Sequence, residues 1–300
     1  MLPRLEGFTV AQLGEEDAAT LAVTSEDLER LVATVLGSSR LRAALSDTSV
    51  PGPTRGRVLG DLLEGKVSPR ARTLAVYAAQ VAAAQDVVRN LDELARLAHL
   101  RHEERHVLEP LGHSESRQRV GGYADALLES LPVEEFSRVE GELFAWARAI
   151  EGSRELRRLL QDRDAPVAMR ASATTQLLAD RVHPVTQRLA VFTVEGGRAR
   201  DVIGTLDYLV DYVARARDWR VARVHAARPL TEAATSDLAF SLADLTGQDV
   251  EIQVTDEPDL LGGILVEVGD LRLDATTRGR LGALRDQVLA GAGATASSTH

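Results

Sequence analysis

Residues 260–274 read LLGGILVEVGDLRLD, and this stretch decides the fold of the C-terminal part of the chain. Residues 264–268 alternate in character from one position to the next, which is typical of a strand with one buried face. Residues 271–273 alternate in the same way. The dipeptide Gly269-Asp270 lies between the two runs, so the sequence predicts a tight β-hairpin.

The residues around this hairpin extend it into a small α+β domain. Gly262 and Gly263 are expected where the chain enters the sheet and a Cβ would crowd a neighbour. Asp274 is placed to cap a helix containing Leu281, Leu284 and Val288. Upstream, the patterns predict a strand over 219–227, a helix over 231–246 and a strand over 250–254. We expect this domain to span 218–290, with a disordered Ala/Gly/Ser/Thr-rich tail over 291–300.

The rest of the chain is helical in pattern and contains an internal repeat. Adding 115 to the residue numbers of the first part aligns it with residues 123–217 without a gap. The identities are well above chance, which indicates a duplicated domain. They include Gly37/Gly152, Ser38/Ser153, Pro51/Pro166, Arg55/Arg170, Leu63/Leu178, Pro69/Pro184, Leu74/Leu189, Asp86/Asp201 and Leu94/Leu209.

Each repeat has short breaks that separate about six amphipathic helices, which predicts a compact antiparallel bundle. In the first repeat, Ser25 is expected to cap a helix with Leu28, Leu31 and Val32 on one face. The predicted fold is mainly α, with two tandem six-helix bundles followed by the α+β domain. The predicted boundaries are 1–105 for the first bundle, 106–122 for a connector and 123–217 for the second bundle.

Composition excludes several classes of function. The net charge of −10 argues against nucleic acid as a partner, because phosphate binding needs a basic face. The chain has no cysteine, so disulfides and a thiol nucleophile are excluded. Neither a signal-peptide core nor an apolar run of the roughly 18 residues that a transmembrane helix needs is found. Any membrane association is therefore expected to depend on a partner.

Residues 102–106 read HEERH and match the zinc-peptidase pattern H-E-x-x-H. Two imidazoles at i and i+4 of a helix can share a zinc ion, with Glu103 as the general base. The alternative is a solvated connector, because the segment is highly charged and lies between the repeats. A zinc peptidase using His102, Glu103 and His106 therefore stays an alternative, although so short a pattern often arises by chance.

Residues 60–66 read GDLLEGK and match the first seven positions of a P-loop. Val67 stands where the magnesium-binding Ser or Thr belongs, and the segment lies at the end of a helix instead of after a strand. The second repeat needs no glycine at the equivalent position, so Gly65 is predicted to end a helix. The scattered histidines indicate no Ser/His/Asp site, and we expect no catalytic, cofactor-binding or metal-binding residues.

The residues of the C-terminal segment also carry a resemblance. Asp259-Leu-Leu-Gly-Gly, Gly269-Asp270, Asp274 and Arg280-Leu281 resemble the C-terminal signature of the F-type ATP synthase delta subunit family, which includes the oligomycin-sensitivity-conferring protein. Tyr123-Ala-Asp-Ala-Leu127 is similar to the usual opening of that family. Residues 116–290 thus resemble a whole family member, and residues 1–105 an extra bundle found in longer members.

The resemblance implies a peripheral-stalk (stator) subunit without catalytic activity, on the cytoplasmic face of the cell membrane. Its implied partners are N-terminal helices of the alpha subunit and a membrane-anchored b-type stalk subunit, which the C-terminal domain is expected to contact. An alpha-subunit helix would lie between the first and fifth helices of a bundle, so Tyr123, Leu127, Leu189 and Phe192 are candidate groove or core residues. A helical adaptor of another assembly stays an alternative.

Overall fold

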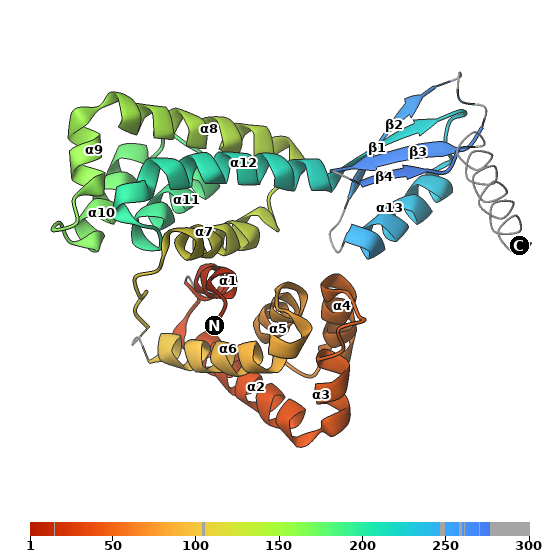
Figure 1. Cartoon of the computed structure of the whole chain (residues 1–300), viewed down its shortest axis with the longest axis horizontal. Coiled ribbons are helices and arrows are strands. Elements are labelled where there is room, and N and C mark those ends of the chain that lie inside the picture. Colours follow the sequence, from red (N-terminus) through yellow and green to blue (C-terminus); the bar gives the residue numbers. More distant parts are fainter. Residues whose placement is uncertain are drawn as a thin grey trace, which may run out of the picture. The chain divides into compact units, whose positions relative to one another are not determined.

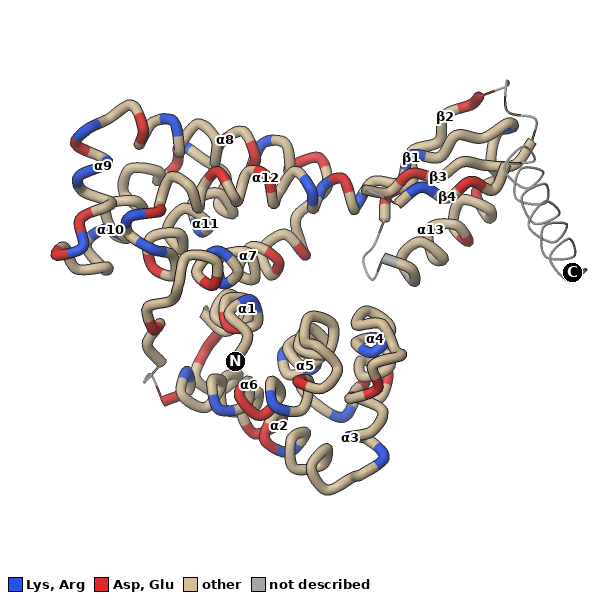
Figure 2. The backbone as a smooth tube through the Cα atoms, viewed as in Figure 1, with Lys and Arg blue, Asp and Glu red and all other residues tan. Residues whose placement is uncertain are grey.

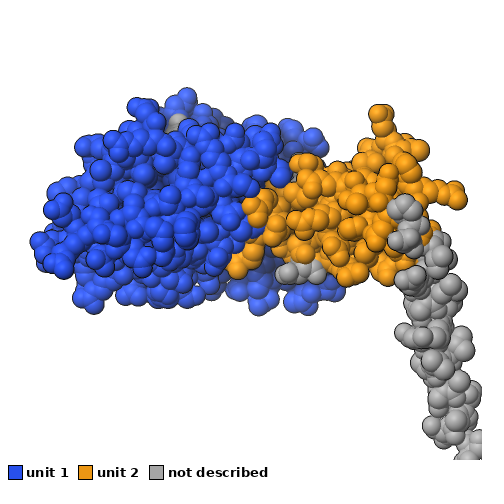
Figure 3. All heavy atoms as spheres, turned by 90° about the horizontal axis from the view of Figure 1, so that it is seen from above, with its two compact units in different colours: residues 1–214 blue, residues 215–300 orange. Residues whose placement is uncertain are grey.

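The computed structural model describes residues 1–14, 16–103, 106–246, 250–257, 260, 262–269 and 271–276. The chain divides into two compact units, Met1–Ala214 and Arg215–His300, which Figure 3 colours separately. Helices make up the described part of the first unit, and the second contains a small sheet (Figure 1). The prediction of a mainly helical chain with a small C-terminal sheet is therefore confirmed.

The first repeat contains helices α1 to α6. Their bounds are α1 (Pro3–Leu13), α2 (Ala18–Gly37), α3 (Ser39–Leu45), α4 (Gly52–Leu63), α5 (Pro69–Val81), the 3-10 helix η1 (Ala84–Asp86) and α6 (Val87–His102). The second repeat contains α7 (His113–Leu128), α8 (Val133–Gly152), α9 (Arg154–Gln161), α10 (Val167–Leu178), α11 (Pro184–Glu195), η2 (Ala199–Asp201) and α12 (Val202–Arg220). The helices of the two repeats follow one another in the same order and with similar lengths.

The shift of 115 residues found in the sequence also relates the helices. It converts the bounds of α2 into those of α8, those of α4 into those of α10, and those of η1 into those of η2. The caps repeat as well. Ser38 Oγ accepts a hydrogen bond from Leu41 N at 3.3 Å, and Ser153 Oγ accepts one from Leu156 N at 3.2 Å. The same local interactions therefore begin α3 and α9.

Three helix boundaries differ from those that the sequence pattern indicates. Asp17 begins α2, because its Oδ1 accepts a hydrogen bond from Thr20 N at 2.7 Å. The prediction that Ser25 is the cap is wrong, and Ser25 lies buried within the helix. Helix α7 begins at His113, inside the range 106–122 treated above as a connector, and α12 continues to Arg220, so Trp219 is helical and not the start of a strand.

A left-handed residue follows the fourth helix of each repeat. Gly65 has φ +66°, and the equivalent Asp180 has φ +57°. The turn is closed in both repeats, by Lys66 N donating to Leu63 O at 3.0 Å and by Arg181 N donating to Leu178 O at 3.1 Å. Gly65 thus ends α4 as predicted, and the P-loop-like segment lies in a helix and its terminal turn.

The second unit is a four-stranded sheet with one described helix. Its elements are β1 (Val221–Ala226), α13 (Glu232–Thr246), β2 (Glu251–Asp256), β3 (Ile264–Val268) and β4 (Leu271–Asp274), with strand order β2-β1-β3-β4 (Figure 1). β1 pairs parallel with β2 and antiparallel with β3. Ala222, Val224 and Val266 point to the same side of the sheet and form its core with Leu242 of α13.

The hairpin and its entry glycines agree with the sequence prediction. β3 and β4 pair antiparallel with Val268 opposite Leu271, and Gly269 in the turn has φ +52°. Gly263 has φ +85°, and a Cβ there would lie 2.3 Å from Ala275 O. Asp274 Oδ1 accepts a hydrogen bond from Thr276 N at 2.9 Å, but the helix and tail predicted beyond it lie outside the described residues.

The left-handed turn gives a matched pair of stability tests. Gly65→Ala is expected to lower the free energy of unfolding by about 1 kcal/mol, because a Cβ is unfavourable at positive φ. Asp180→Gly is expected to raise it slightly, by less than about 1 kcal/mol, since relief of that strain exceeds the added entropy of the unfolded chain. Urea unfolding of both variants measures the difference; equal effects in the two repeats would contradict the shared backbone geometry.

Candidate interaction surfaces

Helices α1 and α7 bring the two repeats together at very short range. A Cβ on Gly7 would lie 1.8 Å from Arg119 O, and a Cβ on Gly122 would lie 1.8 Å from Arg4 O. The shift of 115 converts Gly7 into Gly122 and Arg4 into Arg119, so each contact is the other with its roles exchanged. Such reciprocity defines a two-fold interface. The repeats are therefore joined by an approximate two-fold axis that lies between α1 and α7.

Each repeat also has one stacked aromatic pair beside this interface. The rings of Phe8 and Tyr77 have centroids 3.7 Å apart, and those of Tyr123 and Phe192 have centroids 3.8 Å apart. These are equivalent pairs, linking the first and fifth helices of each repeat. Tyr123 is half-buried and also packs against the core of the first repeat. The face of α7 that carries Tyr123 is thus covered by the first repeat.

A polar network surrounds Arg4 at one side of the interface. Its Nε donates to Asp125 Oδ2 at 2.8 Å and to Tyr77 OH at 3.1 Å, and its Nη2 donates to Tyr212 OH at 2.6 Å. Both tyrosine hydroxyls also donate to Asp125. Burial, reinforced by the charge of Asp125, raises the pKa of Tyr77 and of Tyr212. Both phenols therefore remain protonated donors, which keeps the Asp125 carboxylate satisfied.

The equivalent arginine, Arg119, is almost fully buried at 2% exposure of its side chain. Its Nε and Nη2 donate to Gly196 O at 2.9 and 2.7 Å, and its Nη1 donates to Glu109 O at 2.9 Å. The same Nη1 lies 3.3 Å from Glu6 Oε2, and His106 Nε2 lies 3.5 Å from Glu6 Oε1. Glu6 on α1 is thus held by Arg119 of α7 and by His106 of the segment that precedes α7.

The four candidate groove residues lie in the interior of the second repeat or at the interface between the repeats. Leu127 is 6% exposed, Leu189 0% and Phe192 1%, so these three are core side chains. Tyr123 is the one at the interface between the repeats. The residues that form this interface were missed. Aligning residues 4–8 (RLEGF) with 119–123 (RVGGY) matches Arg4 to Arg119 and Gly7 to Gly122, and that signal identifies them.

The HEERH segment does not form the two-histidine face of a zinc helix. α6 ends at His102, whose side chain is exposed, whereas His106 lies against Glu6. Among the described residues, no group of three His, Cys, Asp or Glu side chains is arranged to hold a metal ion. Glu103, the proposed general base, lies beside His99, with 3.2 Å between its Oε1 and His99 Nε2.

Several apolar side chains lie on the surface. Within the described residues they include Phe144, Val167, Met169 and Leu177 of the second repeat, Val58 and Leu62 of α4, and Phe240 and Leu245 of α13. Figure 2 shows both basic and acidic positions on the helices of the first unit. No helix in the described ranges has the length and apolar character needed to cross a bilayer. Exposed apolar patches often mark contacts with other macromolecules, so these side chains are candidate contact residues.

Comparison with known proteins gives the family. The family model of the ATP synthase delta (OSCP) subunit matches residues 120–288. The ATP synthase subunit delta of Kineococcus radiotolerans is 32% identical over 88% of this chain and 87% of its own length. That of Nocardia farcinica is 34% identical over 94% of this chain and 95% of its own. The chain therefore belongs to the ATP synthase delta (OSCP) subunit family.

A solved structure is also similar to part of the chain. A chain of the Toxoplasma gondii mitochondrial ATP synthase hexamer covers 57% of this chain and 97% of its own length, with 21% identity and a TM-score of 0.25. These values are too low to support a structural inference. The family assignment therefore depends on the sequence matches.

The glycines of the α1–α7 interface predict a sharp difference between matched variants. Gly122→Ala is expected to lower the free energy of unfolding by about 2 kcal/mol, because its Cβ overlaps a backbone oxygen that only helix displacement can move. Gly141→Ala on α8, where nothing lies within 4 Å, is expected to raise it by about 1 kcal/mol. Chemical unfolding measures both values. A Gly122→Ala protein as stable as the wild type would show that the close approach of α1 and α7 is absent in solution.

Glu6 predicts a pH dependence of stability. Its burial raises the pKa, but the hydrogen bond from His106 and the charge of Arg119 outweigh burial, so the pKa lies below its usual value of 4.5. A lowered folded pKa stabilises the fold above the unfolded pKa and loses that effect as the pH falls through the folded pKa. The advantage of the wild type over Glu6→Gln should therefore be constant from pH 6 to about 5 and shrink below about 4.5.

Urea unfolding at a series of pH values measures this advantage for Glu6→Gln, with the exposed Glu26→Gln as the matched control. A difference between wild type and Glu6→Gln that stays constant down to pH 3 would show that Glu6 has no ionic role in the interface.

Proposed function

We propose that this chain is the delta subunit in the peripheral stalk of an F-type ATP synthase. The observation that carries the proposal is the match of the relatives along 88–94% of the chain, which includes both repeats and the C-terminal unit. The protein is a non-catalytic subunit of this membrane-associated complex. It links the catalytic head to the membrane-anchored part and resists the torque of the rotor, so that rotation drives ATP synthesis.

The finer architecture extends this proposal. We propose that each repeat is one six-helix bundle, with the α+β domain of 218–290 following them. A stator must transmit force without yielding, and the short contacts between α1 and α7 support such a role for the first unit. Close-packed protein interiors have low compressibility and transmit strain. The two repeats would then act mechanically as one body.

The proposed partners are N-terminal helices of the alpha subunit and a b-type stalk subunit, on the cytoplasmic face of the membrane. An alpha-subunit helix would lie against α7 and α11 near Tyr123 and Phe192, with Leu127 and Leu189 supporting them from the core. Because the first repeat covers Tyr123, this binding requires α1 to move aside. The C-terminal unit would contact the b-type subunit, for which the 77% exposed Phe240 of α13 is an apolar anchor.

Two titrations by calorimetry test the proposal on the full-length protein, one with a synthetic alpha-subunit N-terminal peptide and one with a soluble segment of the b-type subunit from the same organism. Both should bind. Phe240→Asp should weaken binding of the b-type segment at least about tenfold, because it removes a buried aromatic contact, and leave the alpha peptide unaffected. The matched control for the b-type titration is Phe144→Asp, which makes the same substitution at an exposed phenylalanine of the first unit and should leave binding of the b-type segment unchanged.

Hydrogen exchange distinguishes the route of binding. If the alpha peptide displaces α1, amides of Pro3–Leu13 should exchange faster in the complex than in the free protein. Binding of neither probe would overturn the stator assignment. Binding of the alpha peptide with no change in α1 would overturn the proposed role of Tyr123 and Phe192.

A further inference from the structure

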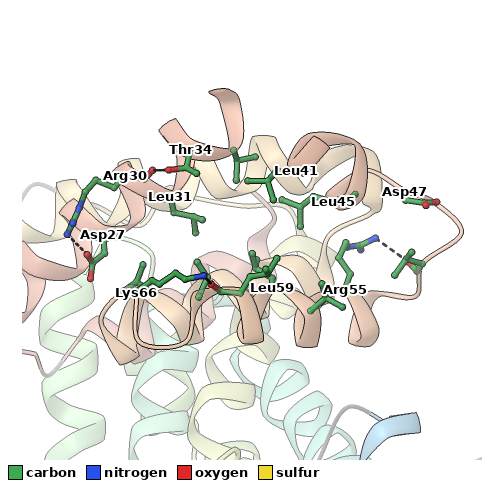
Figure 4. Close-up of a pocket in the computed structure, with 17 residues that line it drawn as sticks. Asp27, Arg30, Leu31, Thr34, Leu41, Leu45, Asp47, Arg55, Leu59 and Lys66 are labelled. Atoms are coloured by element: carbon green, nitrogen blue, oxygen red, sulfur yellow. Dashed lines mark hydrogen bonds and ion pairs between the residues drawn. The ribbon is translucent and has the colours of Figure 1, made fainter. Parts of the chain in front are cut away.

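The first repeat contains an apolar pocket between α2 and α3 on one side and α4 on the other (Figure 4). Its volume is about 470 Å³, and its walls include Leu31, Val35, Leu45 and Leu59. At its mouth, Val58 and Leu62 are 52% and 46% exposed. This volume and lining are typical of sites for small apolar ligands, which occupy roughly 300–1,000 Å³.

The second repeat has different side chains at several of the positions that line this pocket. The shift of 115 places Trp146 at the position of Leu31 and Leu159 at that of Ala44, and both replacements are larger. Trp146 is 8% exposed, so its indole is buried in the corresponding region of the second repeat. The same arrangement of helices is therefore compatible with a large side chain at the position of Leu31.

Two of the cations that line the pocket, Arg55 and Lys66, have no carboxylate partner among the described residues. Lys66 Nζ donates to Leu62 O at 2.7 Å, and no ion pair of Lys66 is found among the described residues. The neighbouring Arg30 is paired with Asp27, whose Oδ2 also accepts a hydrogen bond from Ser68 N at 2.6 Å. Arg55 donates to Ala79 O and Ala82 O at 2.9 and 2.7 Å. Arg55 is buried at 5% exposure and its guanidinium is held by these carbonyls, whereas Lys66 is exposed. Among the described cations that line the pocket, Lys66 is therefore the one available to an anion.

We propose that this pocket binds an amphiphilic carboxylate, with the apolar chain between Leu31 and Leu59 and the carboxylate on Lys66. The apolar walls stabilise the chain by removing it from water. The ammonium group of Lys66 gives the ligand its orientation, because an anionic head left in the apolar part would lose its hydration without compensation. The site lies on α2, α3 and α4, away from the α1–α7 interface, and the proposal goes beyond the stator function.

Calorimetry with dodecanoate below its micelle concentration tests the proposal on the full-length protein. We expect saturable binding of one molecule, with dodecanol binding about fivefold more weakly and dodecyltrimethylammonium more weakly still, because only the carboxylate pairs with Lys66. Lys66→Gln should weaken dodecanoate about fivefold and leave dodecanol unchanged. Dodecanoate binding that is absent, unsaturable or unaffected by the head group would overturn the proposal.

Variants that copy the second repeat locate the ligand. The double variant Leu31→Trp with Ala44→Leu should abolish dodecanoate binding, because the larger side chains fill the pocket. If the double variant does not fold, Ala44→Leu alone is used instead, and it should weaken dodecanoate binding. Trp146→Leu, the reverse change at the equivalent position of the second repeat, is the control. It should leave the affinity of the first-repeat pocket for dodecanoate unchanged. Unaltered binding by a folded, pocket-filled variant would overturn the assignment.

The composition offers an independent measurement, because Lys66 is the single lysine of the 300-residue chain. Dodecanoate should protect Lys66 from acetylation by an amine-reactive ester, and peptide mass analysis distinguishes it from the other amine, at Met1. Equal acetylation of Lys66 with and without saturating dodecanoate would contradict the proposed position of the carboxylate. If a protein segment of the stalk protects Lys66 and dodecanoate does not, the pocket is a docking site for that partner and the proposal is wrong.

Discussion

The first unit depends on how closely α1 and α7 approach each other. Packed helices usually lie with their axes about 8–10 Å apart, and the separation is set by the side chains between them. Here glycines occupy the contact points, and a backbone oxygen of the opposite helix lies where a Cβ would be. The arginines one turn earlier contact the opposite repeat. Arg4 donates a hydrogen bond to Asp125 of the second repeat, and Arg119 donates one to Glu6 of the first. The small residues thus determine the separation, and the ionic and aromatic contacts follow from it.

Duplication has preserved the framework while changing what fills it. The turn after the fourth helix is left-handed in both repeats, although one has Gly65 and the other Asp180. A pocket lies beside Leu31 between the second and fourth helices of the first repeat, and the equivalent residue of the second repeat is the buried Trp146. Hydrogen bonds and helix caps determine the backbone, so side chains outside these contacts can diverge without loss of the fold. Such divergence can give two copies of one domain different binding partners.

Much of this fold could be predicted from the sequence. The internal repeat, the helices and the β-hairpin follow from periodicity and from glycines such as Gly65 and Gly263, because these are local properties of the chain. The α1–α7 interface could not be predicted from amphipathic patterns, since Gly7 and Gly122 provide no apolar side chain to count. The helix start at Asp17 could not be predicted either, because aspartate and serine are both suitable cap residues and the local sequence does not distinguish them. In the structure Asp17 caps α2, and Ser25 is buried within the helix. The stalk contacts depend on other chains and remain proposals.

The reciprocal form of the α1–α7 contact has a consequence for assembly. A two-fold contact inside one chain can be made equally well between two chains, with α1 of each molecule on α7 of the other, which is the geometry of domain swapping. What opposes this exchange is the short segment between the end of α6 at His102 and the start of α7 at His113. A short tether holds its two ends at an effective concentration on the order of millimolar. Below that concentration the contact within one chain is favoured over the same contact between two chains, whereas a segment too short to let α7 reach α1 of its own chain would leave only the contact between chains.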